Sequence, residues 1–112
     1  MSNSTVAVLT DSGAAHLDGY FTGLAQIERV TRVVVADPSG ASEQLAKKLL
    51  GAKLADFGRD HHKTLTDHTP SMAVVTTEAV QGASVIRTAL EANVHVLAEK
   101  PSCVRAEDFE QL

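Results

Sequence analysis

The sequence predicts an α/β fold with a doubly wound parallel sheet, on the strength of two observations. First, short apolar runs of strand length alternate with longer segments in which apolar residues recur every three or four positions, the period of an amphipathic helix. Second, residues 94–98, which read VHVLA, have the length and bulk of a strand that is covered on both faces, as strands of parallel sheets are. This alternation favours parallel strands joined by right-handed crossovers.

The first half of the chain predicts two strand–helix pairs. Residues 5–10 are a β-branched run that we expect to form the first strand, and a helix follows from Gly13. Residues 30–37 are the second strand, ended by a Pro-Ser-Gly breaker, and residues 42–50 are the second helix, with Gly51 just past its end. The apolar face of the first helix is expected to hold Leu17, Tyr20, Phe21, Leu24 and Ile27.

The second half predicts three more strands. Residues 53–57 and 72–77 are strands, and the polar segment 59–68 between them is either a helix or a loop. Residues 80–92 are a helix that leads through Asn93, in a left-handed cap, to the strand 94–98. The buried side of that helix is expected to hold Val85, Ile86, Ala89 and Leu90.

The final segment, residues 106–112, begins another helix and has barely two turns. An intact domain of this class would normally finish that helix. We therefore expect residues 1–112 to be one domain that is truncated at its carboxyl end, with a naturally short protein as the alternative.

Composition narrows the class of protein. The chain has 112 residues, a net charge of −4 and 44% hydrophobic residues, as ordinary globular proteins do. Nucleic acid is an unexpected partner, because there is no basic run and the net charge would repel phosphate. The apolar runs are too short to span a membrane, and the start MSNST does not resemble a secretory signal. The single cysteine, Cys103, excludes an intramolecular disulfide and fits a cytoplasmic location.

A polar triplet, Glu99, Lys100 and Pro101, follows the last strand at the edge where parallel sheets bind ligands. The segment ALEANVHVLAEKP, with the strand that ends in ADP, resembles the glucose-fructose oxidoreductase and inositol dehydrogenase family, Gfo/Idh/MocA, over residues 6–112. The resemblance implies a Rossmann-like domain that binds NAD or NADP.

By the same resemblance, Lys100 lies beside the nicotinamide and the substrate, where it positions them or moves a proton, while Glu99 and Pro101 shape the turn. A second domain, absent here, would supply most of the substrate pocket. The resemblance thus implies a homo-oligomeric enzyme when full length, with a sugar or polyol as its small-molecule substrate. Only the full-length protein is expected to catalyse the conversion of substrate.

The loop after the first strand, TDSGAAH, stands where a dinucleotide-binding domain has a glycine-rich turn. The three positions at which such a turn has glycine are occupied here by Thr10, Ser12 and Ala15. Gly13 lies between the last two of these. A Cβ at the second place stands where the pyrophosphate approaches, and a β-branched residue resists positive φ. The helix amino terminus still offers amide donors, and the hydroxyls of Thr10 and Ser12 add possible phosphate contacts.

Asp37 ends the second strand about twenty residues after this loop. A carboxylate at that place accepts hydrogen bonds from the adenine ribose and repels a 2′-phosphate, which favours NAD over NADP. The alternative is that Asp37 and the Pro-Ser-Gly after it merely form a good turn.

Two further places bear on function. Where the family has threonine, proline and then histidine after the fourth strand, this chain has Thr77, Glu78 and Gly82. Thr77 keeps its place as a cofactor contact, but Glu78 brings a negative charge toward the dinucleotide. These departures favour a competing interpretation, a non-catalytic Rossmann-like module that serves in assembly or binds another ligand. His61, His62 and His68 match no common zinc spacing, so we expect no metal site.

Overall fold

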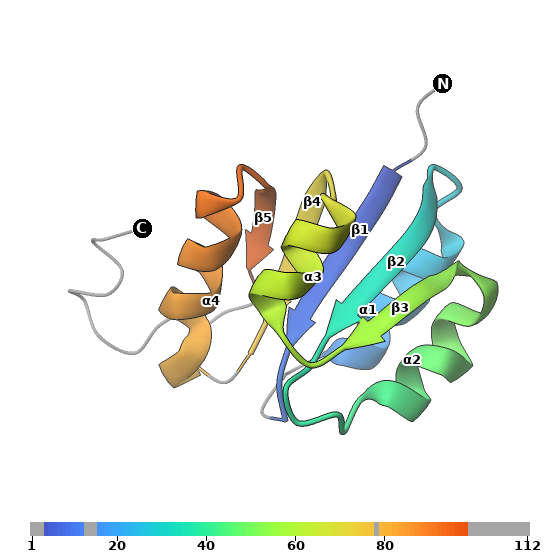
Figure 1. Ribbon diagram of the computed structural model, residues 1–112. Helices are drawn as coiled ribbons and strands as arrows, with labels where there is room; N and C mark the ends of the chain where they lie inside the picture. Colours follow the sequence, from blue (N-terminus) through green and yellow to red (C-terminus); the bar gives the residue numbers. More distant parts are fainter. Residues whose placement is uncertain (1–3, 13–15, 78, 99–112) are drawn as a thin grey trace.

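The described part of the chain is built around one parallel β-sheet. The computed structural model describes residues 4–12, 16–77 and 79–98. Five strands pair in parallel in the order β3-β2-β1-β4-β5 (Figure 1). The strands are β1 (Ser4–Thr10), β2 (Val30–Ala36), β3 (Leu54–Gly58), β4 (Met72–Thr76) and β5 (His95–Ala98). The predicted doubly wound parallel sheet is therefore confirmed.

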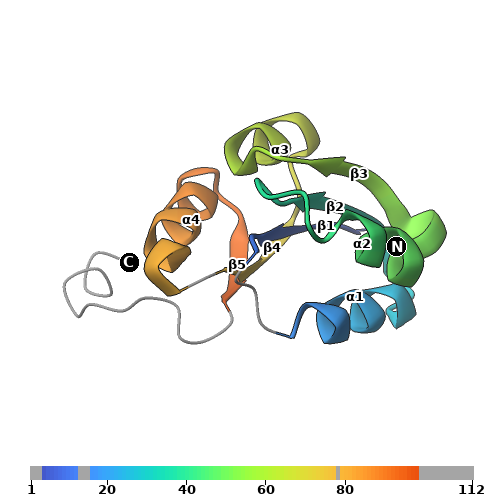
Figure 2. The ribbon, with the colours of Figure 1, turned by 90° about the horizontal axis from the view of Figure 1, so that it is seen from below.

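In the part of the chain that the structure describes, four α-helices cover the two faces of the sheet (Figure 2): α1 (Leu17–Gln26), α2 (Glu43–Leu50), α3 (His61–His68) and α4 (Ala79–Glu91). Val6 and Val8 pack into the cluster that includes α1 and α2, whereas Ala7 and Leu9 pack into the cluster that includes α3 and α4. Both faces of β1 are thus apolar because both are covered. A 3₁₀ turn, Gly51–Lys53, precedes β3. No described helix has the length and hydropathy that a membrane-spanning segment requires.

Most predicted elements form close to their expected bounds. The short third strand begins one residue later than expected, and the polar segment 59–68 becomes a helix rather than a loop. An N-cap decides the latter, because Asp60 Oδ1 accepts a hydrogen bond of 3.0 Å from the backbone N–H of Lys63. Asn93 has φ 61°, the left-handed conformation predicted for it.

Three expectations about burial were wrong. Ile27 is 49% exposed, because α1 ends at Gln26 and Ile27 is an extended residue that caps it. Leu90 is 43% exposed near the end of α4, although Val85, Ile86 and Ala89 are buried as expected. Leu97 in β5 is 47% exposed, so that strand is not covered on both faces. The physical reason is that β5 lies at the edge of the described sheet, where α4 packs on one face only.

The chain reverses its direction across the sheet between β1 and β4. From β1 it moves outward through β2 to β3, returns through α3, and then moves outward on the other side through β4 to β5. In open parallel sheets, the carboxyl ends of the two strands at such a reversal leave a crevice between the loops that diverge there. This edge positions the candidate site. The predicted helix 106–112 lies outside the described residues.

Candidate functional site

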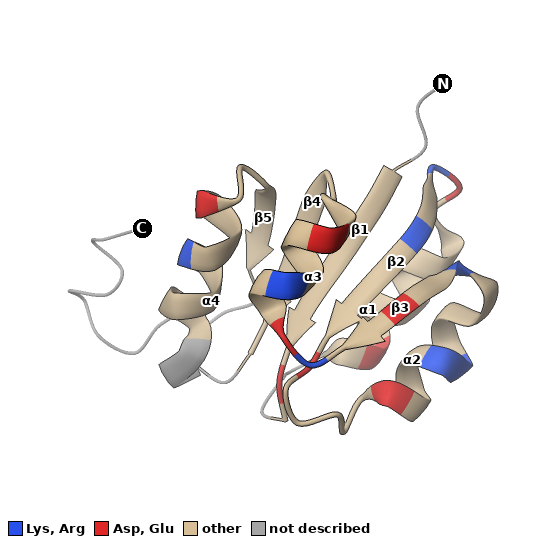
Figure 3. Cartoon of the chain, viewed as in Figure 1, with Lys and Arg blue, Asp and Glu red and all other residues tan. Residues whose placement is uncertain are grey.

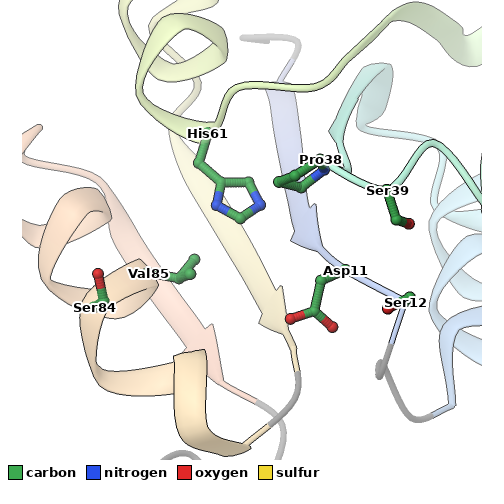
Figure 4. Close-up of a pocket in the computed structure, with 7 residues that line it drawn as sticks. All are labelled: Asp11, Ser12, Pro38, Ser39, His61, Ser84 and Val85. Carbon is green, nitrogen blue, oxygen red and sulfur yellow. The ribbon is translucent and has the colours of Figure 1, made fainter.

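A cleft of about 450 Å³ opens at the carboxyl ends of the strands. Four separate segments line it: the loop after β1, the loop after β2, the start of α3 and the first half of α4 (Figure 4). Its lining residues are Asp11, Ser12, Pro38, Ser39, His61, Ser84 and Val85. The cleft therefore mixes hydroxyls and a carboxylate with the apolar surfaces of a proline and a valine.

The loop after β1 places only part of the predicted phosphate contacts in this cleft. Ser12 is exposed and lines the cleft, as expected of a phosphate contact. Thr10, in contrast, is fully buried, and its hydroxyl reaches the carbonyl oxygen of Asp11 at 3.5 Å, the long limit of a hydrogen bond. Gly13 and Ala15 lie outside the described residues. The phosphate role of these four residues stays a prediction.

Four hydrogen bonds hold the Asp37 side chain at this edge. Its Oδ1 accepts hydrogen bonds from the backbone N–H and the hydroxyl of Ser39, at 2.9 and 2.6 Å. Its Oδ2 accepts the same pair of bonds from Ser42, at 3.1 and 2.6 Å. The side chain is 0% exposed. Asp37 thus organises the connection from β2 to α2, and its predicted contact with a ribose stays a prediction.

The hydrogen bonds also set the charge of Asp37. Burial opposes ionisation of the carboxyl, but the hydroxyls and backbone amides of Ser39 and Ser42 together outweigh burial and hold the pKa of Asp37 below its usual range. The group is therefore a carboxylate at neutral pH.

A glycine shapes the same loop. The backbone N–H of Gly40 donates a hydrogen bond of 2.9 Å to the carbonyl oxygen of Asp37, which closes a turn with Pro38 at its second position. Gly40 has φ 71°, and the Arg59 guanidinium packs against it so closely that an added Cβ would collide with Nη2 unless that side chain moved. The turn proposed from the sequence exists, and only glycine fits it without strain.

His61 is a cleft residue that sequence reasoning did not select for this role. It is the first residue of α3, and its Nε2 lies 2.9 Å from the carbonyl oxygen of Thr10. A carbonyl oxygen only accepts, so Nε2 carries a proton. Figure 4 shows the imidazole between Pro38 and Val85. The signal was present in the sequence, because the residue after the N-cap of a helix that follows a parallel strand must lie near the ligand-binding edge.

The remaining predicted positions are distributed as follows. Thr77 is half-buried directly after β4, at the same edge. Glu99, Lys100 and Pro101 lie outside the described residues, but β5 ends at Ala98, so they follow its carboxyl end in sequence. Figure 3 shows acidic residues on the loops at this edge, and the loop that follows β3 carries both a basic and an acidic residue, Arg59 and Asp60.

His61 and His68, at the two ends of α3, contact different parts of the protein. His61 bonds to β1, whereas His68 Nε2 lies 2.8 Å from Oδ2 of Asp56 at the other end of the helix. Within the described ranges, no group of three or more potential metal ligands comes together.

Comparison with protein families assigns residues 13–112 to the oxidoreductase family GFO_IDH_MocA, whose described domain has an NAD-binding Rossmann fold. None of the curated proteins compared with the chain matches it.

Solved structures share this fold at low sequence identity. The scyllo-inositol dehydrogenase of Lactobacillus casei, solved with NAD(H) and scyllo-inositol bound, is 20% identical with a TM-score of 0.81, over 98% of this chain and 32% of that one. The myo-inositol 2-dehydrogenase of Lactobacillus plantarum is 17% identical with a TM-score of 0.77, over 98% and 32%. An oxidoreductase of Agrobacterium radiobacter, solved with NAD⁺, L-tartaric acid and magnesium, is 12% identical with a TM-score of 0.79, over 98% and 31%. The chain thus spans about a third of the length of these proteins.

The cleft residues fit the adenosine half of a dinucleotide. Pro38 and Val85 offer apolar surface on two sides of the cleft, as a purine ring requires, and the hydroxyls of Ser12, Ser39 and Ser84 offer polar contacts. The ionised carboxylate of Asp37 stands beside this cleft, behind Ser39. The chemistry of these side chains is therefore compatible with a nucleotide.

Proposed function

Since the chain belongs to the Gfo/Idh/MocA family of oxidoreductases, we propose that it is the cofactor domain of an enzyme that moves hydride to or from a carbon bearing a hydroxyl. The proposed substrate is a sugar or polyol, and this part of the proposal is supported by the two inositol dehydrogenases among the similar structures. The observation that carries the proposal is the cleft at the reversal of the sheet, lined from four segments.

In this proposal, different residues of the chain bind the cofactor and act on the substrate. When bound, the nicotinamide supplies the site that accepts or donates hydride. Ser12, His61 and Val85 hold the adenosine half in the cleft. Lys100, which follows β5 at the same edge in sequence, orients the substrate hydroxyl and accepts or returns its proton. Glu99 and Pro101 shape the turn that presents this lysine.

NAD is the proposed cofactor in preference to NADP. Asp37 is ionised, and its negative charge at the end of β2 would repel a 2′-phosphate on the adenine ribose. A cytoplasmic location and homo-oligomeric assembly of the full-length enzyme stay predictions from the sequence.

The alternative is a module of the same fold that no longer binds a dinucleotide. Two observations favour it: Thr10, at a place that normally holds glycine, is buried in β1, and the Asp37 carboxylate is engaged by Ser39 and Ser42. The two functions differ in a simple measurement, because only the first requires affinity for NAD.

The deciding experiment is calorimetric titration of NAD⁺ and NADP⁺ into the full-length protein. We expect NAD⁺ to bind with a dissociation constant of roughly micromolar order and NADP⁺ at least about tenfold more weakly, with the difference reduced in Asp37→Ala. If circular dichroism shows that the protein is folded and neither nucleotide binds, the oxidoreductase proposal is wrong and the non-catalytic module is favoured.

The role of Lys100 is tested separately by Lys100→Met, which keeps the length of the side chain and removes its charge. The variant should bind NAD⁺ as the parent does and lose most of its turnover with inositols, because a group that acts on the substrate proton lowers kcat by about 10²–10⁴ when removed. Unchanged turnover would remove Lys100 from the mechanism.

A further inference from the structure

The Asp37 carboxylate has no free hydrogen-bonding capacity for a ribose. An ionised carboxylate offers about four acceptor sites, two on each oxygen. The backbone N–H and hydroxyl of Ser39 occupy those of Oδ1, and the same two groups of Ser42 occupy those of Oδ2. A ribose hydroxyl can therefore reach this carboxylate only if one of the four donors leaves.

The four donors differ in how easily they can leave. Ser42 is 7% exposed and is the N-cap residue of α2, where its carbonyl oxygen accepts a hydrogen bond of 2.9 Å from Ala46. The backbone N–H of Ser39 is fixed within the turn that the bond from Gly40 to Asp37 closes. The hydroxyl of Ser39 belongs to an exposed side chain that lines the cleft, and it can rotate about one bond. It is the donor that can leave without moving the backbone.

We propose that the Ser39 hydroxyl is a placeholder for a ribose hydroxyl of the cofactor, and this inference rests on the function proposed above. Ser39 donates to Oδ1 of Asp37 at 2.6 Å and satisfies a buried charge until the adenosine ribose arrives. The hydroxyl then rotates away, and the ribose 2′-hydroxyl donates to Oδ1 in its place. Ser39 also gives up the hydrogen bond of 3.1 Å that it accepts from the backbone N–H of Ala41.

This exchange has a measurable consequence. Replacing one hydroxyl donor by another changes the free energy little, and the loss of the bond from Ala41 opposes the exchange, so in the parent protein the 2′-hydroxyl adds little to affinity. When the placeholder is removed, Oδ1 lacks one donor in the free protein, and the ribose fills a site that nothing else satisfies. Ser39→Ala should therefore bind NAD more tightly, which distinguishes a placeholder from a residue that contacts the ribose itself.

The test compares NAD⁺ with its 2′-deoxyadenosine analogue by calorimetry, on the full-length protein and three variants. In the parent, the two nucleotides should differ by no more than about threefold; in Ser39→Ala, the ratio should rise to roughly tenfold or more, through tighter binding of NAD⁺. Ser39→Thr keeps the hydroxyl and should keep the parent ratio. Ser42→Ala removes the matching donor from the buried side and should lower the melting temperature without raising the ratio.

Two outcomes would overturn the inference alone. An unchanged ratio in Ser39→Ala would mean that the ribose never reaches Asp37, and weaker NAD⁺ binding in that variant would mean that Ser39 itself binds the cofactor. Failure of both nucleotides to bind any folded form, the parent included, would instead reject the proposed function and the placeholder with it.

Discussion

The Nε2 of His61 lies 2.9 Å from the carbonyl oxygen of Thr10, which ties the first residue of α3 to the last residue of β1. The two residues are 51 positions apart in sequence. The contact fixes the imidazole at the mouth of the cleft, between the loop after β2 and α4 (Figure 4). It therefore joins the scaffold of the sheet to a side chain that is in reach of a ligand.

Replacing His61 by alanine should weaken NAD binding about fivefold, the equivalent of about 1 kcal/mol, because the imidazole that Thr10 holds in the wall of the cleft is no longer there to contact the ligand. Calorimetric titration of NAD⁺ measures this effect. His62, the exposed next residue of α3, provides the matched control, since His62→Ala should leave the affinity unchanged. Equal effects of the two substitutions would argue that His61 acts only through the stability of the helix.

Asp37→Asn should destabilise the fold by about 1–3 kcal/mol at pH 7, because the amide group presents donors to Ser39 or Ser42, which also donate. The cost should depend on pH. The pKa of Asp37 is lower in the folded protein than in the unfolded chain, so its contribution is present above the ordinary carboxyl pKa of about 3.9. That contribution is lost as the pH falls through this value to the pKa of the folded state.

Urea unfolding of the parent protein and of Asp37→Asn between roughly pH 2.5 and 7 provides the measurement. The two stability curves should converge at the acid end. A gap that stays constant over the whole range would show that the ionisation of Asp37 contributes nothing to folding.

Gly40→Ala should cost about 1–2 kcal/mol, because residue 40 has the left-handed φ of 71°. An added Cβ would also meet the Arg59 guanidinium, but that group is the far end of a flexible side chain and can move aside at little cost. The double variant Gly40→Ala with Arg59→Ala, compared with Arg59→Ala alone, isolates the backbone strain. Thermal unfolding should show the same loss of melting temperature when Gly40→Ala is added to either background. A loss that disappears in the Arg59→Ala background would mean that the φ of 71° carries no strain.

Asp60→Ala should destabilise the protein by about 1 kcal/mol, because the backbone N–H of Lys63 loses its capping acceptor. Asp60→Asn keeps an oxygen at the same place and should retain most of the stability. The comparison by thermal unfolding tests whether the cap, rather than the negative charge, makes residues 61–68 helical. A loss of the same size in both variants would assign the effect to charge.

The fold was largely readable from the sequence because its two signals are local. A strand covered on both faces must be apolar along its whole length, and residues 5–10 and 30–36 are nearly so. Helix boundaries follow from residues near them in sequence, as Gly51 shows at the end of α2, where it adopts φ 55°. Burial at the edges was less readable. Leu97 and Leu90 are as apolar as core residues, and only the position of β5 and α4 in the sheet leaves them exposed.

The fold class, the edge of the sheet that carries the cleft, and Asp37 as a residue of that edge all follow from the order of apolar and polar residues along the chain. The contact of His61 with Thr10, and the four hydrogen bonds from Ser39 and Ser42 that occupy the Asp37 carboxylate, are visible in the folded protein alone. Hydrogen bonds depend on direction and on distances of about 3 Å, which are set when the strands and helices pack and which no spacing in the sequence encodes.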